Sequence, residues 1–77
     1  MNKDRRKRLE KIVATLQDAM AELEYIKDEE QEAFDNLPES LQYSEKGETM
    51  EEYVDDIDSV ISDLDSLIES IEDIVNR

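Results

Sequence analysis

The sequence contains neither cysteine nor histidine. Without cysteine the chain has no disulfide bonds and no thiolate metal sites, and this absence is compatible with a reducing compartment. Without histidine it lacks the commonest metal ligand and the commonest general base. The aspartates Asp55, Asp56 and Asp58 lack the glycine and the terminal glutamate of a calcium-binding loop. No glycine-rich phosphate loop and no paired nucleophile is present either, so we expect no catalytic activity, no metal site and no cofactor.

Long hydrophobic runs are also missing. No apolar stretch approaches the ~18 residues that cross a bilayer, and the charged N-terminal segment lacks the apolar part of a signal peptide. We therefore expect a soluble, cytoplasmic protein that makes no contact with a membrane. The 77 residues form one small domain. The core of such a domain supplies only ~3–5 kcal/mol of stability unless a partner subunit adds to it.

A regular repeat of seven residues runs through the last part of the chain, residues 50–77. These 28 residues divide into four units, and the first, fourth and fifth positions of every unit are apolar. These three positions share one face of a helix, so the repeat predicts an amphipathic helix with a wide apolar stripe over residues 49–76. The first positions are Met50, Ile57, Leu64 and Ile71, the fourth are Tyr53, Val60, Leu67 and Ile74, and the fifth are Val54, Ile61, Ile68 and Val75.

The same repeat occupies residues 9–36, where ten of the twelve corresponding positions are apolar. It predicts a second amphipathic helix of similar length over residues 4–35, with Asn2 or Asp4 as the candidate cap. The first positions are Leu9, Leu16, Leu23 and Glu30, the fourth are Ile12, Ala19, Ile26 and Ala33, and the fifth are Val13, Met20, Lys27 and Phe34.

The two polar exceptions in this repeat, Lys27 and Glu30, lie three residues apart and can pair with each other on the helix surface. In a hairpin they face the region of Asp55 and Asp58. We interpret them as a polar pair that fixes the register of the helices, as polar residues do in coiled coils. A ligand site is the less favoured interpretation.

The repeat stops at residues 36–48, which include the only proline and the only glycine of the chain, Pro38 and Gly47. The residue before a proline is driven out of helical conformation, so the first helix should end near residue 36. Thr49 and Glu52 have the spacing of a capping box, which predicts the start of the second helix. The connection is either a lid over the open end of the hairpin or a recognition loop. Its candidate contacts are Leu37, Pro38, Leu41 and Tyr43.

Together these patterns predict an all-α fold, an antiparallel two-helix hairpin that forms a single domain over residues 1–77. A helix that faces one partner needs two apolar positions in seven, whereas this chain has three. We therefore expect one apolar column of each helix to remain outside the hairpin, a strip that contains either Ile12, Ile26, Val60, Leu67 and Ile74 or its counterpart. This surface either dimerises the chain into a four-helix bundle or docks on another protein. The expected contacts are Ile12, Ile26, Tyr53, Val60, Leu67 and Ile74.

The net charge of −14 is unevenly distributed. Residues 1–11 hold six of the nine basic residues, whereas residues 12–77 hold 21 acidic and three basic ones. We expect the basic segment to lie beside the C-terminal end of the second helix, because the helix dipole and nearby Glu69, Glu72 and Asp73 would offset its charge. A field dominated by carboxylates repels free nucleic acid and anionic membranes, so we expect no direct nucleic-acid partner.

The stretch from Arg5 to about Glu52 resembles a family of small uncharacterised proteins found in phages and mobile elements of bacteria. The likeness is strongest over Glu29–Gln42, with the sequence EEQEAFDNLPESLQ. The resemblance implies a phage or mobile-element origin, and with it an accessory binder or inhibitor of host machinery. No activity is established for the family, so the resemblance implies no mechanism and gives no site residues.

The function that the sequence favours is a non-enzymatic, acidic protein-interaction module that binds a protein partner or itself through an apolar helical face. The alternative depends on the acidic surface. Its carboxylates either only keep the protein soluble, or they imitate nucleic-acid phosphates and block the basic groove of a host defence or replication protein. Binding of the second kind would weaken steeply as the salt concentration rises.

Overall fold

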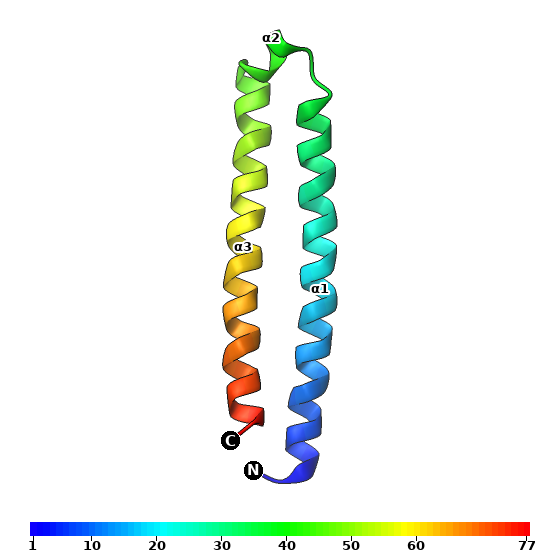
Figure 1. The fold of residues 1–77 in the computed structure, drawn as a ribbon, viewed down its shortest axis with the longest axis vertical. Helices are drawn as coiled ribbons and strands as arrows, with labels where there is room; N and C mark the ends of the chain where they lie inside the picture. The colour runs from blue at the N-terminus through cyan, green and yellow to red at the C-terminus, as the bar shows by residue number, and fades with distance from the viewer.

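The computed structural model describes all 77 residues as two long helices joined at one end by a short one (Figure 1). Helix α1 spans Lys3–Asp35, α2 spans Glu39–Gln42 and α3 spans Glu45–Val75. The long helices lie side by side and antiparallel, so that both chain termini are at one end of the molecule and α2 is at the other. The molecule is a rod of 59 × 15 × 12 Å. The all-α helical hairpin predicted from the repeat is confirmed.

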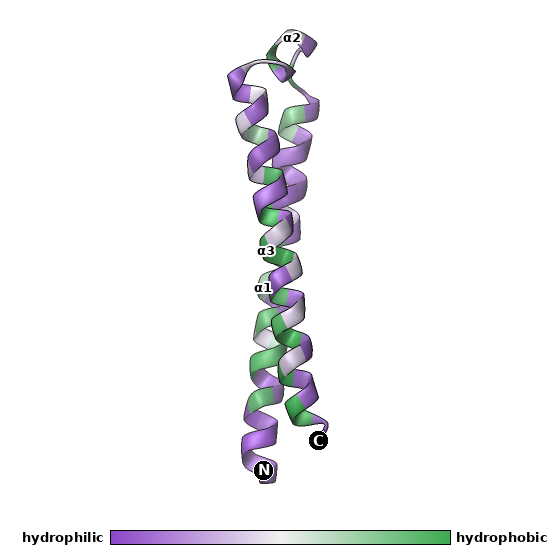
Figure 2. Cartoon of the chain, turned by 90° about the vertical axis from the view of Figure 1, so that its left-hand side faces the viewer, coloured by the Kyte–Doolittle hydropathy of each residue, from purple (hydrophilic) through white to green (hydrophobic).

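Helices α1 and α3 meet along the first and fifth positions of the seven-residue units. Every one of these positions is buried or half-buried, and the most deeply buried are Val13, 8% exposed, and Ile68, 3% exposed. Positions spaced alternately four and three residues apart form the seam of a two-stranded coiled coil. Hydrophobic residues recur along both helices between hydrophilic ones (Figure 2). Because this seam is all that two helices can hide between them, the fourth positions have no partner within the chain.

The basic end of α1 lies beside the C-terminal end of α3. Asn2 caps α1, and its side-chain Oδ1 accepts a hydrogen bond from the Arg5 amide at 2.8 Å. The half-buried Arg6 donates from its guanidinium to the carbonyl oxygen of Arg77 at 3.4 Å, beyond the last turn of α3. A cation at the negative end of the α3 dipole is favourable. Arg6, whose positive charge is unfavourable at the N-terminal end of α1, therefore stabilises the C-terminal end of α3.

Helix α3 begins at Glu45, four residues before the predicted start, so the second half of the predicted connection is helical and Thr49 is not the cap. The cap is Ser44, which has extended backbone torsion angles and accepts a hydrogen bond from the Gly47 amide at 3.5 Å. Glu45 and Glu48 in the first turn favour a helix start here, because acidic residues complement the dipole. The predicted start is wrong because Gly47, which in the sequence suggests a loop, lies within the first turn of α3.

Replacing Ser44 by alanine is expected to lower the free energy of unfolding by about 1 kcal/mol, the usual effect of losing a side-chain cap. Replacing Thr49 by alanine should change it by less than about 0.5 kcal/mol, because Thr49 lies inside the helix. Urea unfolding followed by circular dichroism measures both variants. An equal loss of free energy of unfolding for Thr49→Ala would place the start of α3 at Thr49, as the sequence predicts.

The turn is closed by side-chain contacts that the sequence did not indicate. The amide nitrogen of Gln42 donates to the carbonyl oxygens of Phe34 at 3.3 Å and Leu37 at 3.2 Å, near the C-terminal end of α1. Gly47 is buried where the end of α2 passes α3. A Cβ atom there would lie 2.6 Å from the carbonyl carbon of Gln42 and 2.7 Å from the carbonyl oxygen of Leu41. Only glycine leaves room for this approach.

Candidate interaction face

The fourth positions of both long helices are exposed. Ala19 and Ala33 are the two small ones, and each of the six large ones is between 37% and 59% exposed. These six are the side chains that the repeat predicts as partner contacts. We call the eight residues together the apolar face: Ile12, Ala19, Ile26, Ala33, Tyr53, Val60, Leu67 and Ile74.

The two columns of the apolar face lie on the same side of the hairpin. Second-position residues of the two helices line common hollows, Glu10 with Glu72 near the termini and Gln31 with Glu51 near α2. The second positions of α1 and α3 therefore share one side of the seam. Fourth positions flank the seam on the opposite side of each helix. In an antiparallel pair of helices, equivalent flanking positions lie on the same side of the seam. The fourth positions of α1 and α3 therefore share the other side of the hairpin.

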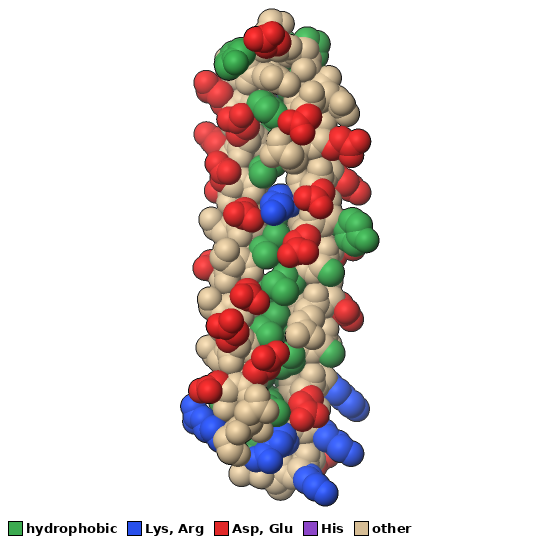
Figure 3. All heavy atoms as spheres, in the orientation of Figure 1, with side chains coloured by type: hydrophobic (Ala, Val, Ile, Leu, Met, Phe, Trp, Pro, Cys, Tyr) green, Lys and Arg blue, Asp and Glu red, His purple; other side chains and the backbone are tan.

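The side opposite the apolar face is acidic. Of its eight second-position residues six are acidic and none is basic: Glu10, Gln17, Glu24, Gln31, Glu51, Asp58, Asp65 and Glu72. We call this set the acidic face. In the view of Figure 3, acidic side chains line both margins of an apolar seam, and basic side chains gather at the end where the termini lie. The hairpin thus presents one apolar side, one acidic side and one basic end.

The ion pair predicted between Lys27 and Glu30 is not formed, whereas the predicted approach of Lys27 to the region of Asp58 is confirmed. Lys27 pairs with Asp58 of α3, with 3.1 Å between Nζ and Oδ1, and makes no ion pair with Glu30. Lys27 and Glu30 are both half-buried, and the carboxylate within ion-pair distance of Lys27 is that of Asp58, across the hairpin. The pKa of Lys27 is raised by its hydrogen bond to Asp58, then by the charge of Asp58, with smaller contributions from Asp28 and Glu24. Whether this layer fixes the register stays a prediction.

The raised pKa of Lys27 makes the stabilisation by this ion pair depend on pH. A lysine whose pKa is higher in the folded than in the unfolded chain stabilises the fold fully below its ordinary pKa, about 10.5, and loses that effect as pH rises through the folded value. We expect the difference in urea midpoint between the native chain and its Asp58→Asn variant to be constant from pH 7 to pH 10 and to shrink above that. A difference that persists unchanged at pH 12 would contradict the pairing.

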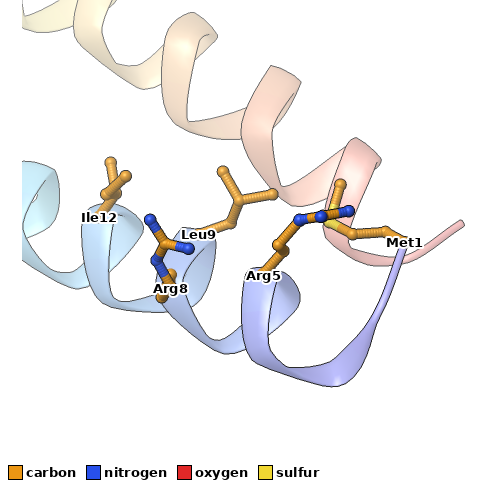
Figure 4. A pocket seen from close by; sticks show the side chains of 5 residues that line it. All are labelled: Met1, Arg5, Arg8, Leu9 and Ile12. Carbon is orange, nitrogen blue, oxygen red and sulfur yellow. The ribbon is translucent and has the colours of Figure 1, made fainter.

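A hollow of about 400 Å³ continues the apolar face at the terminal end of α1. It is lined by Met1, Arg5, Arg8, Leu9 and Ile12, and Figure 4 shows the α1 side chains rising from one side of the helix. The sequence did not single out this hollow. Extending the repeat towards the N-terminus would have indicated it. The preceding unit, residues 2–8, has Arg5 at its fourth and Arg8 at its seventh position, on the same side of α1 as Ile12.

No three acidic side chains lie together in an arrangement that could hold a metal ion. No helix has an apolar stretch of the length that a membrane span requires. Three comparisons with known proteins were made. A scan against protein-family models, a search of curated proteins and a search of solved structures each find no match. Function is therefore inferred from the apolar face, the acidic face and the basic end.

The segment between the long helices closes the hairpin, and its role in recognition stays a prediction. Leu37 is half-buried at the end of the hairpin, as in a lid. Pro38 precedes α2 and is exposed, and Leu41 and Tyr43 are also exposed, Tyr43 to 79%. A shallow hollow runs from Tyr43 to the second-position residue Glu51, so Tyr43 lies toward the acidic face. The end of the hairpin thus buries part of Leu37 and leaves three of the four predicted side chains exposed.

Proposed function

We propose that this chain is a non-enzymatic protein-interaction module that binds a protein partner, which includes a second copy of itself, through the apolar face. The observation that supports the proposal is the pair of exposed apolar columns along one side of a rigid hairpin. Contiguous exposed apolar patches are uncommon on monomeric proteins and mark interaction sites. A phage or mobile-element origin and a cytoplasmic location belong to the proposal, the first on the resemblance alone.

The energetics favour covering the apolar face. Full burial of a large apolar side chain contributes about 1.5–3 kcal/mol, and the six large side chains of this face remain about half exposed. Completing their burial is therefore worth roughly 1 kcal/mol each. A partner with an equal face doubles the gain to about 12 kcal/mol, which lies in the upper part of the ~4–15 kcal/mol that association costs. The net stability of the hairpin, on the order of 5 kcal/mol, makes such a gain important for the fold as well.

Replacing Leu67 and Ile74 together by glutamine is expected to lower partner affinity by at least 100-fold, because two apolar contacts become polar groups that must lose water on binding. The hairpin should stay folded, since both side chains are exposed. The matched control is Asp65→Asn with Glu72→Gln, two residues before each position and on the acidic face. Capture of bacterial proteins on the immobilised chain, with circular dichroism to verify folding, measures the difference. Equal losses for both pairs would contradict the proposal.

The acidic face supports a second candidate function, that of an inhibitor which competes with nucleic acid for the basic groove of a host defence or replication protein. The observation in its favour is the two parallel columns of carboxylates on one side of the rod, with Lys27 as the one cation paired across the hairpin. Rows of fixed negative charge resemble a nucleic-acid backbone in their electrostatics.

Salt separates the two functions. At ~0.5 M salt the charges of exposed carboxylates are largely screened, so binding through the acidic face should be lost. Binding through the apolar face should persist, because burial of apolar surface does not depend on charge. The same capture at low and high salt, repeated with the glutamine and control pairs, assigns each captured protein to one face. Capture that disappears at high salt and with the control pair favours the inhibitor.

A further inference from the structure

We propose that the apolar face is covered by a second copy of this chain laid end over end, so that the α2 end of each copy lies over the terminal end of the other. This inference rests on the proposed function and names the partner. In such a pair α1 packs on α1 and α3 on α3, related by a twofold axis across the middle of the face. The result is a four-helix bundle built from two hairpins.

The order of residues in α1 is self-complementary in this orientation. From the terminal end to the α2 end its column on the apolar face reads isoleucine, alanine, isoleucine, alanine, at positions 12, 19, 26 and 33. Against a reversed copy of α1, each isoleucine meets an alanine. Large side chains that face small ones let two helices interlock at close distance. The contacts of Arg6 with Arg77 and of Lys27 with Asp58 fix the alignment of α3 against α1. In this alignment Val60 and Leu67 lie near the middle of the face. In the end-over-end pair, Val60 of each copy meets Leu67 of the other.

The distribution of charge selects the same orientation. Residues 1–11 hold six of the nine basic residues, whereas residues 28–56 hold twelve acidic residues and only Lys46 as a basic one. These segments lie at opposite ends of the rod. Two copies that point the same way would put basic end on basic end and acidic end on acidic end. End-over-end pairing puts opposite charges together at both ends, which partly offsets the repulsion between two chains of net charge −14.

The hollow at the terminal end fits this arrangement. Arg5 and Arg8 stand beside Leu9 and Ile12 on the same side of α1 (Figure 4), so the surface there is both cationic and apolar. End-over-end pairing lays the acidic α2 end of the second copy over it. Ala33 of that copy brings only a methyl group to Ile12, which leaves the two guanidinium groups room to reach the acidic residues around it.

Single cysteines test the orientation, because the chain contains none of its own. Thr15, Glu29 and Ser70 are exposed seventh-position residues on the apolar side of the hairpin. A Thr15→Cys chain mixed with a Glu29→Cys chain should form a covalent dimer with a short bismaleimide linker. Each variant carries a single cysteine, so every covalent product must join two copies. The same Thr15→Cys chain mixed with Ser70→Cys is the matched control, since those positions meet only when two copies point the same way.

The expected result is a covalent heterodimer from the first mixture in at least tenfold excess over the second. A dimer from the second mixture only, or from neither, overturns the end-over-end pairing. Sedimentation of the unmodified chain distinguishes this failure from a failure of the proposed function. A chain that stays monomeric at all concentrations has no second copy as partner, while the glutamine variants still show whether a different protein uses the apolar face.

Discussion

Replacing Ile68 by alanine is expected to remove most of the free energy of unfolding of the protein at 25 °C. Ile68 is the most buried side chain of the hairpin, 3% exposed, at the fifth position that faces α1. Removing that much buried hydrocarbon costs about 2–5 kcal/mol, and a core of this size supplies only about 3–5 kcal/mol. Urea or thermal unfolding followed by circular dichroism measures the loss.

The adjacent Leu67 is the matched control for this prediction. It is 59% exposed on the apolar face, so Leu67→Ala should change the free energy of unfolding by less than about 0.5 kcal/mol when the chain is dilute enough to be monomeric. The same substitution at two adjacent residues of similar size should therefore differ several-fold in its effect on the free energy of unfolding. Equal losses at the two positions would mean that the fourth-position column is buried within the hairpin, which is the opposite of the structure.

Replacing Gly47 by alanine is expected to destabilise the hairpin by about 1–3 kcal/mol, the range of overpacking in a tight interior. In an ordinary helix the same change stabilises by about 0.5–1 kcal/mol, so the sign of the effect is diagnostic. The new Cβ would lie 2.6 Å from the carbonyl carbon of Gln42. This carbon belongs to the backbone, which cannot turn aside as a side chain can.

Lys46→Ala, at the exposed neighbouring position in the first turn of α3, is the control and should change stability by less than about 0.5 kcal/mol. Both variants are compared by their urea midpoints. Stabilisation by Gly47→Ala would show that α2 does not pack against the start of α3, and the closed end of the hairpin would then need another explanation.

The sequence predicted the long helices and their seam because each rests on a periodic pattern that many residues share. One polar side chain, such as Lys27, does not obscure the pattern, because the other seven fifth positions of the two helices are apolar. The repeat also predicted that one column of each helix would be left over, since geometry allows only two positions in seven to face a single neighbour. It left open whether the fourth or the fifth positions would face solvent, because either set can form a seam with the first positions. The structure decides between them, with Leu67 exposed beside the buried Ile68.

The turn was harder to predict because it depends on contacts between a few atoms. Gly47 looked like a loop residue, yet its missing side chain makes space for the end of α2 inside a regular helix. The sequence offered two sets of partners for Lys27, Glu30 along the helix and the region of Asp55 and Asp58 across the hairpin, and it did not decide between them. Local spacing favoured Glu30, and the tertiary structure brought Asp58 within 3.1 Å.

The most direct test of the apolar face is the mass of the chain in solution, measured by sedimentation equilibrium over a range of concentrations. We predict that the native chain approaches twice its mass of 9.0 kDa and that the Leu67→Gln, Ile74→Gln variant remains at 9.0 kDa with its helical content unchanged. If the native chain and the variant have the same mass, whether both are monomers or both are dimers, the apolar face does not hold copies of this chain together.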